Sequence, residues 1–304
     1  MPSHIYKQQP QNEITRIELE LTSVCNLKCP LCMRERMQLP KKNSFRPIGE
    51  IIDQLDQYAS LRYVTLAGAV AEPTTYPHLF DLLLYLKRRG VEISLYINGD
   101  THTDAYYTKL GAIFNGCDGY VYFTICGSTQ ELHEQYRVGS SLATVIRRLD
   151  IVNRFSGNRG MLTWIVFNYN QDDFLDNFRE FQQQYNTEYF YTLPIDEHFQ
   201  TQSPIHLPLE QRQQYIRFID RTDMPESCPA NENNFIQIDY TGNTHPCTLH
   251  RLYGESRCFE CSAKNKQMLR RNQIFNVAEA ESDTSEFPLR LHANDSEKIR
   301  NRRN

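Results

Sequence analysis

The stretch IELELTSVCNLKCPLC, residues 17–32, joins an alternating apolar run to a close group of cysteines. Its first five residues alternate apolar and acidic side chains, which is typical of a half-buried β-strand. Cys25, Cys29 and Cys32 follow at once in a CxxxCxxC spacing. This order predicts a strand whose carboxyl end carries a loop of three thiols.

These three cysteines favour an iron–sulfur cluster. Cubane clusters are usually held by four cysteine thiolates, so three thiolates leave one iron open to another ligand. The alternative is a zinc knuckle with its fourth ligand elsewhere, such as His4 or His78. The cysteine spacing differs from that of the common zinc pairs, so the cluster is the better interpretation.

The composition narrows the class of protein. The chain has 304 residues, enough for one large domain and a smaller one, and its formal net charge is -4. Its apolar runs are too short to span a membrane and its first residues are polar, so we expect a cytoplasmic protein without a membrane segment. In a reducing compartment, nine cysteines indicate metal binding or catalysis. The slightly acidic charge argues against a nucleic-acid substrate.

Short β-type runs alternate with amphipathic helical windows between Ile14 and about residue 200. Examples of the helical windows are IGEIIDQLDQYA (48–59) and HLFDLLLYLKRRG (78–90), and Gly90 is expected to end the second. Six such β/α units in series predict parallel strands, in a doubly wound sheet or in a barrel. The six strand candidates are 17–21, 62–66, 92–97, 120–125, 162–167 and 188–193.

Polar, glycine or cysteine residues follow the first five of these strands. Because the carboxyl ends of parallel strands meet at one edge, we expect these residues to gather on one rim, where ligands bind. Beyond the first cysteine group they include Gly68, Glu72, Asn98, Gly99, Thr124, Cys126 and 168–170.

The segment ELTSVCNLKCPLC resembles the cluster-binding loop of the radical S-adenosylmethionine (radical SAM) superfamily. The resemblance implies a partial (β/α)6 barrel, similar to an incomplete TIM barrel, and a [4Fe-4S] cluster whose open iron binds S-adenosyl-L-methionine. It also implies reductive cleavage of that cofactor to a 5′-deoxyadenosyl radical, which takes a hydrogen atom from the substrate. An electron donor such as flavodoxin or ferredoxin is implied as a partner.

The resemblance covers most of the first 200 residues. The segment GAVAEPTTYP looks like the loop that binds the methionine amino group, although Ala71 stands where glycine is common. INGD is similar to the family's TNG, and FTICGST is similar to a segment whose hydroxyl reaches the ribose, with Cys126 in the place of an aspartate. A downstream arginine is implied to pair with the methionine carboxylate. The implied cofactor-binding residues are Gly68, Glu72, Asn98, Thr124 and Arg137.

Each of these secondary matches has a structural alternative. Glu72 can serve only to cap a helix that begins near Pro73. Asn98 and Gly99 can form only a turn, and Arg137 can lie on a solvated helix face. Their order at successive strand ends favours the functional interpretation.

A second cysteine group surrounds a predicted hairpin in NFIQIDYTGNTHPC, whose turn is expected at residues 241–243. The group resembles the C-terminal SPASM extension of radical SAM enzymes in its shortened Twitch form, which implies one auxiliary [4Fe-4S] cluster. A structural zinc site is the alternative. The group consists of Cys228, Cys247, Cys258 and Cys261.

We therefore predict a radical SAM partial barrel over 14–200, a small cysteine-rich Twitch-like domain over 201–278 and a polar tail over 279–304. The expected reaction is hydrogen abstraction from a small polar molecule or a peptide side chain, leading to oxidation (dehydrogenation) or epimerisation. Cys126 is a candidate hydrogen donor in an epimerisation, whereas Cys117 is expected to be inert.

Two other functions stay open at this point. One is a non-catalytic iron–sulfur or zinc-binding scaffold. The other is a radical SAM enzyme that modifies a nucleic acid through its basic tail, KIRNRRN at residues 298–304.

Overall fold

The computed structural model describes residues 10–30, 32, 34, 45–67, 71–185, 187–191 and 234–245. Several predicted features lie outside these ranges: Gly68, most of the predicted Twitch-like domain, and the tail. The four cysteines outside them are Cys228, Cys247, Cys258 and Cys261.

The described strands form one sheet in the order β6-β5-β4-β3-β2-β1-β7-β8. Neighbouring strands from β6 to β7 are all parallel, and β8 alone runs antiparallel to its neighbour β7. The six predicted strands and their parallel arrangement are therefore confirmed. The strands are β1 Arg16–Leu19, β2 Tyr63–Leu66, β3 Glu92–Ile97, β4 Gly119–Ile125, β5 Gly160–Val166, β6 Thr187–Tyr191, β7 Phe235–Ile238 and β8 Thr244–His245.

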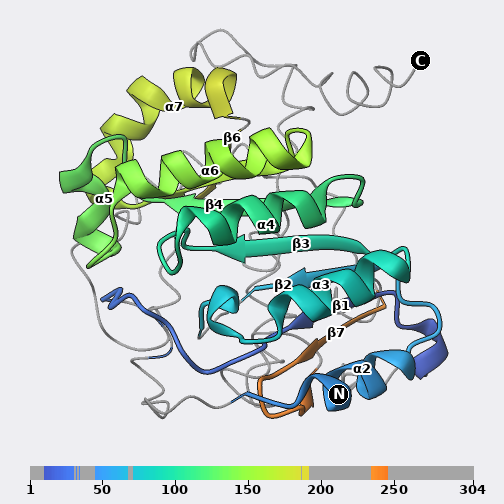
Figure 1. Cartoon of the computed structure of the whole chain (residues 1–304). Coiled ribbons are helices and arrows are strands. Elements are labelled where there is room, and N and C mark those ends of the chain that lie inside the picture. Colours follow the sequence, from blue (N-terminus) through green and yellow to red (C-terminus); the bar gives the residue numbers. More distant parts are fainter. Residues whose placement is uncertain are drawn as a thin grey trace, which may run out of the picture.

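Helices connect the parallel strands and cover one face of the sheet. Figure 1 shows α2, α3, α4, α6 and α7 on the same side of the strands. This one-sided cover gives the partial barrel that the sequence predicts, with the uncovered face of the sheet inside. The helices are α2 Ile48–Asp56, α3 Leu79–Arg88, α4 Asp104–Phe114, α5 Gln130–Tyr136, α6 Leu142–Ser156 and α7 Gln171–Tyr185, with 3-10 turns η1 Gln11–Glu13, η2 Pro73–Thr75 and η3 Asn168–Asn170.

The core lies between the sheet and these helices. Leu95, Phe123 and Trp164 are fully buried there, one from each of three adjacent strands. Alternate residues of a strand point to opposite faces, so the intervening side chains face the interior of the partial barrel. That inner face is polar and aromatic, because it carries Ser94, Tyr96, Tyr122, Thr124 and Thr163.

The predicted hairpin is confirmed as β7 and β8, and β7 extends the barrel sheet. Phe235 pairs with Arg16 of β1, so the hairpin lies beside the first strand although it belongs to the region predicted as the C-terminal domain. The backbone N–H of Thr241 donates to Asp239 Oδ1 over 2.9 Å, and the N–H of Gly242 donates to the Asp239 carbonyl oxygen over 2.9 Å. These bonds close the turn at the predicted place.

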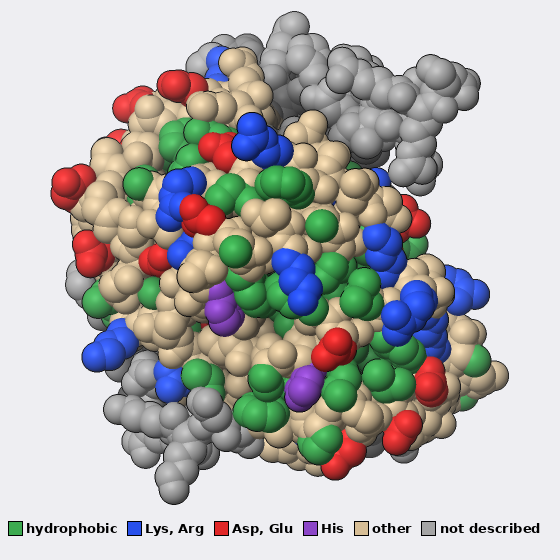
Figure 2. Space-filling view, in the orientation of Figure 1, with side chains coloured by type: hydrophobic (Ala, Val, Ile, Leu, Met, Phe, Trp, Pro, Cys, Tyr) green, Lys and Arg blue, Asp and Glu red, His purple; other side chains and the backbone are tan. Residues whose placement is uncertain are grey.

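The outer surface carries both signs of charge. Acidic and basic side chains are interspersed over the helical face seen in Figure 2. Among the residues that the structure describes, no helix combines the length and the apolar character that a membrane span needs.

Candidate active site

The loops that follow β1, β3 and β4 meet at the carboxyl edge of the sheet, as predicted. Asn26 of the first cysteine loop donates from Nδ2 to the carbonyl oxygen of Asp100, after β3, over 3.3 Å. Lys28 of the same loop donates its backbone N–H to the carbonyl oxygen of Val138, beyond β4, over 3.4 Å. The cysteine loop is thus fastened to two neighbouring loops of the rim.

The three cysteines of this loop are all free thiols, with Cys29 buried and the other two partly exposed. Burial raises the pKa of Cys25 to about 11, and the carboxylate of Glu72 adds to this rise. Burial raises the pKa of Cys29 to about 12, against the effect of Arg137. A bound metal would replace the thiol proton, so ligation and not free ionisation would produce thiolates on this loop.

The backbone N–H of Cys32 donates to the carbonyl oxygen of Cys29 over 3.1 Å, which closes a turn between the last two cysteines of the loop. Within the described part of the chain, no three metal-binding side chains converge closely enough to hold a single ion. A cubane cluster does not need such convergence, because each thiolate binds a different iron atom. The chemistry of the loop therefore fits a [4Fe-4S] cluster, and Cys25, Cys29 and Cys32 stay its predicted ligands.

Glu72 is buried and caps η2, as the structural alternative predicted. Its Oε1 accepts hydrogen bonds from the backbone N–H of Thr74 over 3.2 Å and from the Thr74 hydroxyl over 2.6 Å. Its Oε2 accepts from the backbone N–H of Asn98 over 2.8 Å, which ties the loop after β2 to the loop after β3. Burial raises the pKa of the Glu72 carboxyl, and the donors on Thr74 and Asn98 oppose that rise. The contact of Glu72 with a methionine amino group stays a prediction.

Asn98 connects this carboxylate to the cysteine loop. Its Oδ1 accepts from the backbone N–H of Asp100 over 2.9 Å, which confirms the predicted turn. Its Nδ2 donates to Asn26 Oδ1 over 2.6 Å and lies 3.8 Å from Cys25 Sγ. Gly99 completes the turn with φ of +76°, and a Cβ on it would stand 2.8 Å from the Phe123 ring. Glycine is therefore required at this position.

Arg148 holds this turn from α6, a role that sequence reasoning missed. Its Nη1 donates to the carbonyl oxygen of Gly99 over 2.8 Å and to Asp100 Oδ1 over 3.3 Å. The second oxygen of Asp100 accepts from the backbone N–H of Ser141 over 2.7 Å. A signal was present, since Arg148 falls on the buried face of the predicted helix beside Val145.

Thr124 and Cys126 stand at the end of β4. Thr124 is buried on the inner face beside Thr163, whose hydroxyl has no hydrogen-bond partner among the described residues. Cys126 is fully buried, and its carbonyl oxygen accepts from Asn170 Nδ2 over 2.7 Å. Burial raises the pKa of the Cys126 thiol to about 11, against the effect of the neighbouring Arg137 guanidinium.

Arg137 ends α5 and turns toward the cysteines instead of lying on a solvated helix face. It is partly buried, and its charge acts on both Cys29 and Cys126. Its Nε is buried and has no hydrogen-bond partner within the described residues. A buried guanidinium nitrogen without an acceptor suits an anionic ligand group such as a carboxylate. The structure thus brings Arg137 together with the first cysteine group.

A comparison with protein-family models identifies the family of the chain. Residues 19–181, more than half of the chain, match the model of the radical SAM superfamily. The chain belongs to the radical SAM superfamily. Membership implies a [4Fe-4S] cluster and S-adenosylmethionine as cofactors.

Two curated proteins are similar to this chain over part of its length. The tungsten-containing aldehyde ferredoxin oxidoreductase cofactor-modifying protein of Pyrococcus furiosus is 29% identical over 108 residues, which cover 35% of this chain and 29% of that protein. The probable GTP 3′,8-cyclase of Thermococcus kodakarensis is 32% identical over 89 residues, 28% of each chain. The matched stretch is under a third of either relative.

Solved structures share the radical SAM fold over more of the chain. SuiB of Streptococcus suis bound to S-adenosylmethionine has a TM-score of 0.59 and 12% identity, covering 86% of this chain and 67% of SuiB. The native anSMEcpe protein with bound AdoMet and a Cp18Cys peptide has a TM-score of 0.55 and 14% identity, covering 89% of this chain and 85% of that one. These matches establish the fold alone.

His133 is hydrogen-bonded to the rim of the radical SAM fold, and its burial makes the stability of the folded chain depend on pH. It is fully buried, with Nδ1 accepting from the Cys126 backbone N–H over 3.3 Å and Nε2 within 2.9 Å of Ser140 Oγ. Burial, reinforced by Arg137, lowers its pKa from 6.5 to about 3. Between pH 6.5 and about pH 3, this histidine is therefore protonated in the unfolded chain but neutral in the folded chain. The free energy of unfolding consequently falls as the pH drops below 6.5.

We expect this histidine to cost about 1 kcal/mol of the free energy of unfolding between pH 7 and pH 5.5. The measurement is urea unfolding followed by fluorescence of Trp164, the single tryptophan, which is buried in β5. His133→Gln keeps an acceptor and a donor but does not titrate, so its stability should change less over this range. An equal change in both proteins would contradict this origin.

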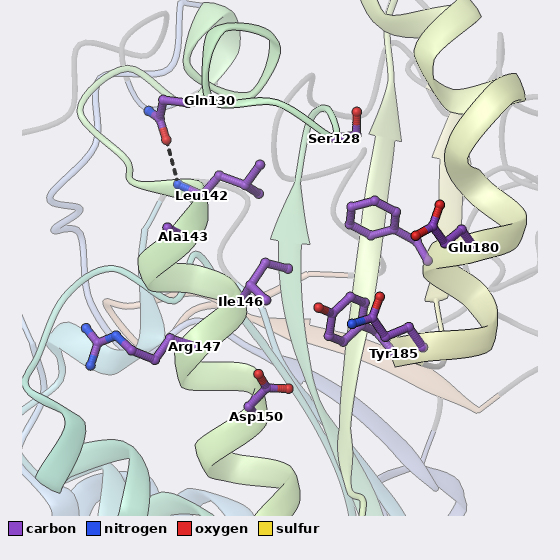
Figure 3. Close-up of a pocket in the computed structure, with 11 residues that line it drawn as sticks. Ser128, Gln130, Leu142, Ala143, Ile146, Arg147, Asp150, Glu180 and Tyr185 are labelled. Carbon is purple, nitrogen blue, oxygen red and sulfur yellow. Dashed lines mark hydrogen bonds between the residues drawn. The ribbon is translucent and has the colours of Figure 1, made fainter.

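A separate cavity of about 610 Å³ lies between α6 and α7, on the helix-covered side of the sheet. Figure 3 shows Leu142 and Ile146 of α6 facing Glu180 and Tyr185 of α7 across it. Ser128 and Gln130, from the segment that follows β4, also line this cavity.

Proposed function

We propose that this protein cleaves S-adenosylmethionine at the cluster and uses the product to abstract hydrogen from a small polar molecule or a peptide side chain. The observation that carries the proposal is the rim itself: it holds three thiols on one loop, and beside them lies Arg137, whose Nε has no hydrogen-bond partner among the residues that the structure describes. When bound, the cluster and its cofactor supply a 5′-deoxyadenosyl radical. Cys25, Cys29 and Cys32 hold the cluster and leave one iron for the cofactor.

The remaining rim residues bind and orient the cofactor in this proposal. The Arg137 guanidinium pairs with the methionine carboxylate, which satisfies its buried nitrogen. The Thr124 hydroxyl, on the inner face of β4, is available to the ribose. Glu72 and Asn98 hold the loops after β2 and β3 in place, so that the backbone of this rim is rigid before the cofactor arrives.

The substrate enters the polar inner face of the partial barrel. The tyrosine rings of Tyr96 and Tyr122 stack there with centroids 4.3 Å apart, beside hydroxyl groups such as that of Thr163. Such a lining favours a substrate with hydroxyl, amide or amino groups. Two similar proteins, a cofactor-modifying protein and one with a bound peptide, agree with a small molecule or a peptide.

The test of this proposal is deoxyadenosine formation. Protein reconstituted anaerobically with iron and sulfide, then given dithionite and S-adenosylmethionine, should release 5′-deoxyadenosine, measured by liquid chromatography and mass spectrometry. Candidate peptides and polar metabolites are then screened for one that increases the release. A reconstituted cluster without any deoxyadenosine formation would favour the scaffold alternative instead.

Two outcomes of hydrogen abstraction are compatible with this chain: oxidation, with the second cysteine group holding an auxiliary electron-accepting cluster, or epimerisation. One observation favours epimerisation. Cys126 places a buried thiol beside Cys29 and Arg137, and not in the core under the helices. A thiol can return a hydrogen atom to a substrate radical, which epimerisation requires. The thiyl radical left on Cys126 would then regain its thiol by taking one electron from the flavodoxin- or ferredoxin-type donor and one proton from solvent.

We expect Cys126→Ala to keep deoxyadenosine formation within about twofold of wild type while product formation falls at least tenfold. The wild-type product formed in D2O should carry one deuterium at the reacted carbon, because thiol hydrogens exchange with solvent. Cys117→Ala is the matched control, since Cys117 is also a buried thiol but lies before β4, away from the rim. Unchanged product yield from Cys126→Ala would exclude the donor role.

A further inference from the structure

We propose that Asn98 donates a hydrogen bond to the Cys25 thiolate of the loaded protein and thereby raises the reduction potential of the cluster. The inference rests on the proposed function, because only that function makes Cys25 a ligand of the cluster. It makes Asn98 a positioning and tuning residue of the iron–sulfur centre, in place of the direct cofactor ligand that the sequence predicted.

The orientation of the Asn98 amide is fixed by its other contacts. Its Oδ1 accepts from the Asp100 backbone N–H over 2.9 Å, which leaves the NH2 group to face the cysteine loop. One N–H of that group donates to Asn26 Oδ1 over 2.6 Å, and the nitrogen stands 3.8 Å from Cys25 Sγ. Asn98 is only 2% exposed, so water does not readily replace this donor.

Ligation of iron changes which bonds the Cys25 sulfur can make. In the free thiol, Sγ can also donate to Asn26 Oδ1, 3.9 Å away. A thiolate has no proton to donate, so it becomes an acceptor only. The donors at hand are then Asn98 Nδ2 and the backbone N–H of Leu27, the latter 3.4 Å from the sulfur.

Hydrogen bonds to cluster sulfurs favour the reduced state, because they stabilise the extra negative charge that one-electron reduction adds. Negative charge on the Glu72 carboxylate, which accepts from the Asn98 backbone N–H over 2.8 Å, acts in the opposite sense, because it disfavours added negative charge nearby. Asn98 stands between the two groups, with its backbone N–H on Glu72 and its side chain toward Cys25. Without the Asn98 amide, the Cys25 sulfur would lie near the Glu72 carboxylate with only the Leu27 backbone N–H as a hydrogen-bond donor among the described residues.

The test is an anaerobic redox titration of reconstituted holoenzyme, followed by the electron paramagnetic resonance signal that changes on addition of S-adenosylmethionine. Asn98→Leu, which removes the donor, should shift the midpoint potential to lower values. Asn98→Asp, which replaces the donor by an anion of the same shape, should shift it further in the same direction. Asn26→Ala measures the effect of loosening the loop, because it removes the other acceptor of Asn98 and the bond of the loop to Asp100 but keeps the Asn98 amide. Its shift in midpoint potential should be smaller than that of Asn98→Leu.

The outcomes separate this inference from the function on which it rests. A wild-type protein without a cofactor-responsive cluster signal would sink the proposed function. A normal wild-type signal with unchanged potentials in both Asn98 variants would overturn the role of Asn98. So would an equal shift in Asn26→Ala, which would indicate a displaced loop. If neither Asn98 variant retains iron, Asn98 serves assembly of the site and the tuning role is also overturned.

Discussion

Changing Cys25, Cys29 and Cys32 together to alanine is expected to remove about four irons per chain and to abolish deoxyadenosine formation. The three thiols come from one loop, fastened to the rim through Asn26 and Lys28, so the triple change removes every thiol of the predicted cluster loop at once. The measurement is iron, sulfide and zinc content after anaerobic reconstitution, beside a deoxyadenosine assay of the same samples.

Cys117→Ala is the matched control, because it removes a buried thiol at the other end of β4 and should keep the wild-type iron content. The wild-type total is informative as well. About eight irons, falling to about four in the triple variant, would place a second cubane on the C-terminal cysteines. About four irons and one zinc would make that group a structural zinc site. Iron content that does not change in the triple variant would contradict the assignment of this loop.

The fold was predictable because its signals are local. Each strand alternates along a few residues, and each amphipathic helix repeats its apolar positions within one segment. The rim was predictable for the same reason, since parallel strands bring their carboxyl ends to one edge. Gly90 illustrates how local the information is: its φ of +70° ends α3, as its place after three basic residues indicated.

Other features depend on contacts between distant segments, which a single sequence does not display. The pairing of β7 with β1 joins residues more than 200 positions apart, and the residue pattern of neither strand predicts which strand it pairs with. The role of Glu72 was ambiguous for a similar reason. Its position suggested both a cap and a cofactor ligand, and only the bond from Asn98 shows that it also bridges two loops.

Glu72→Ala is expected to lower the free energy of unfolding by about 3 kcal/mol. The carboxylate accepts three hydrogen bonds while 3% exposed, so its removal leaves the backbone N–H groups of Thr74 and Asn98 buried without an acceptor. Glu72→Gln should cost about 1 to 2 kcal/mol, because its single oxygen cannot serve both loops and its NH2 group must face one of the donors. Anaerobic urea unfolding followed by Trp164 fluorescence measures both values.

Glu92→Gln is the control, since Glu92 is an exposed acid on β3 and its substitution should change the unfolding free energy by less than about 0.5 kcal/mol. Affinity for S-adenosylmethionine, measured on the same reconstituted proteins, then distinguishes the two roles of Glu72. If the carboxylate only holds the rim, Glu72→Gln should lose stability and cofactor affinity together. A variant with wild-type stability but weakened cofactor binding would instead show that Glu72 contacts the methionine amino group, because nothing else in the rim would have changed.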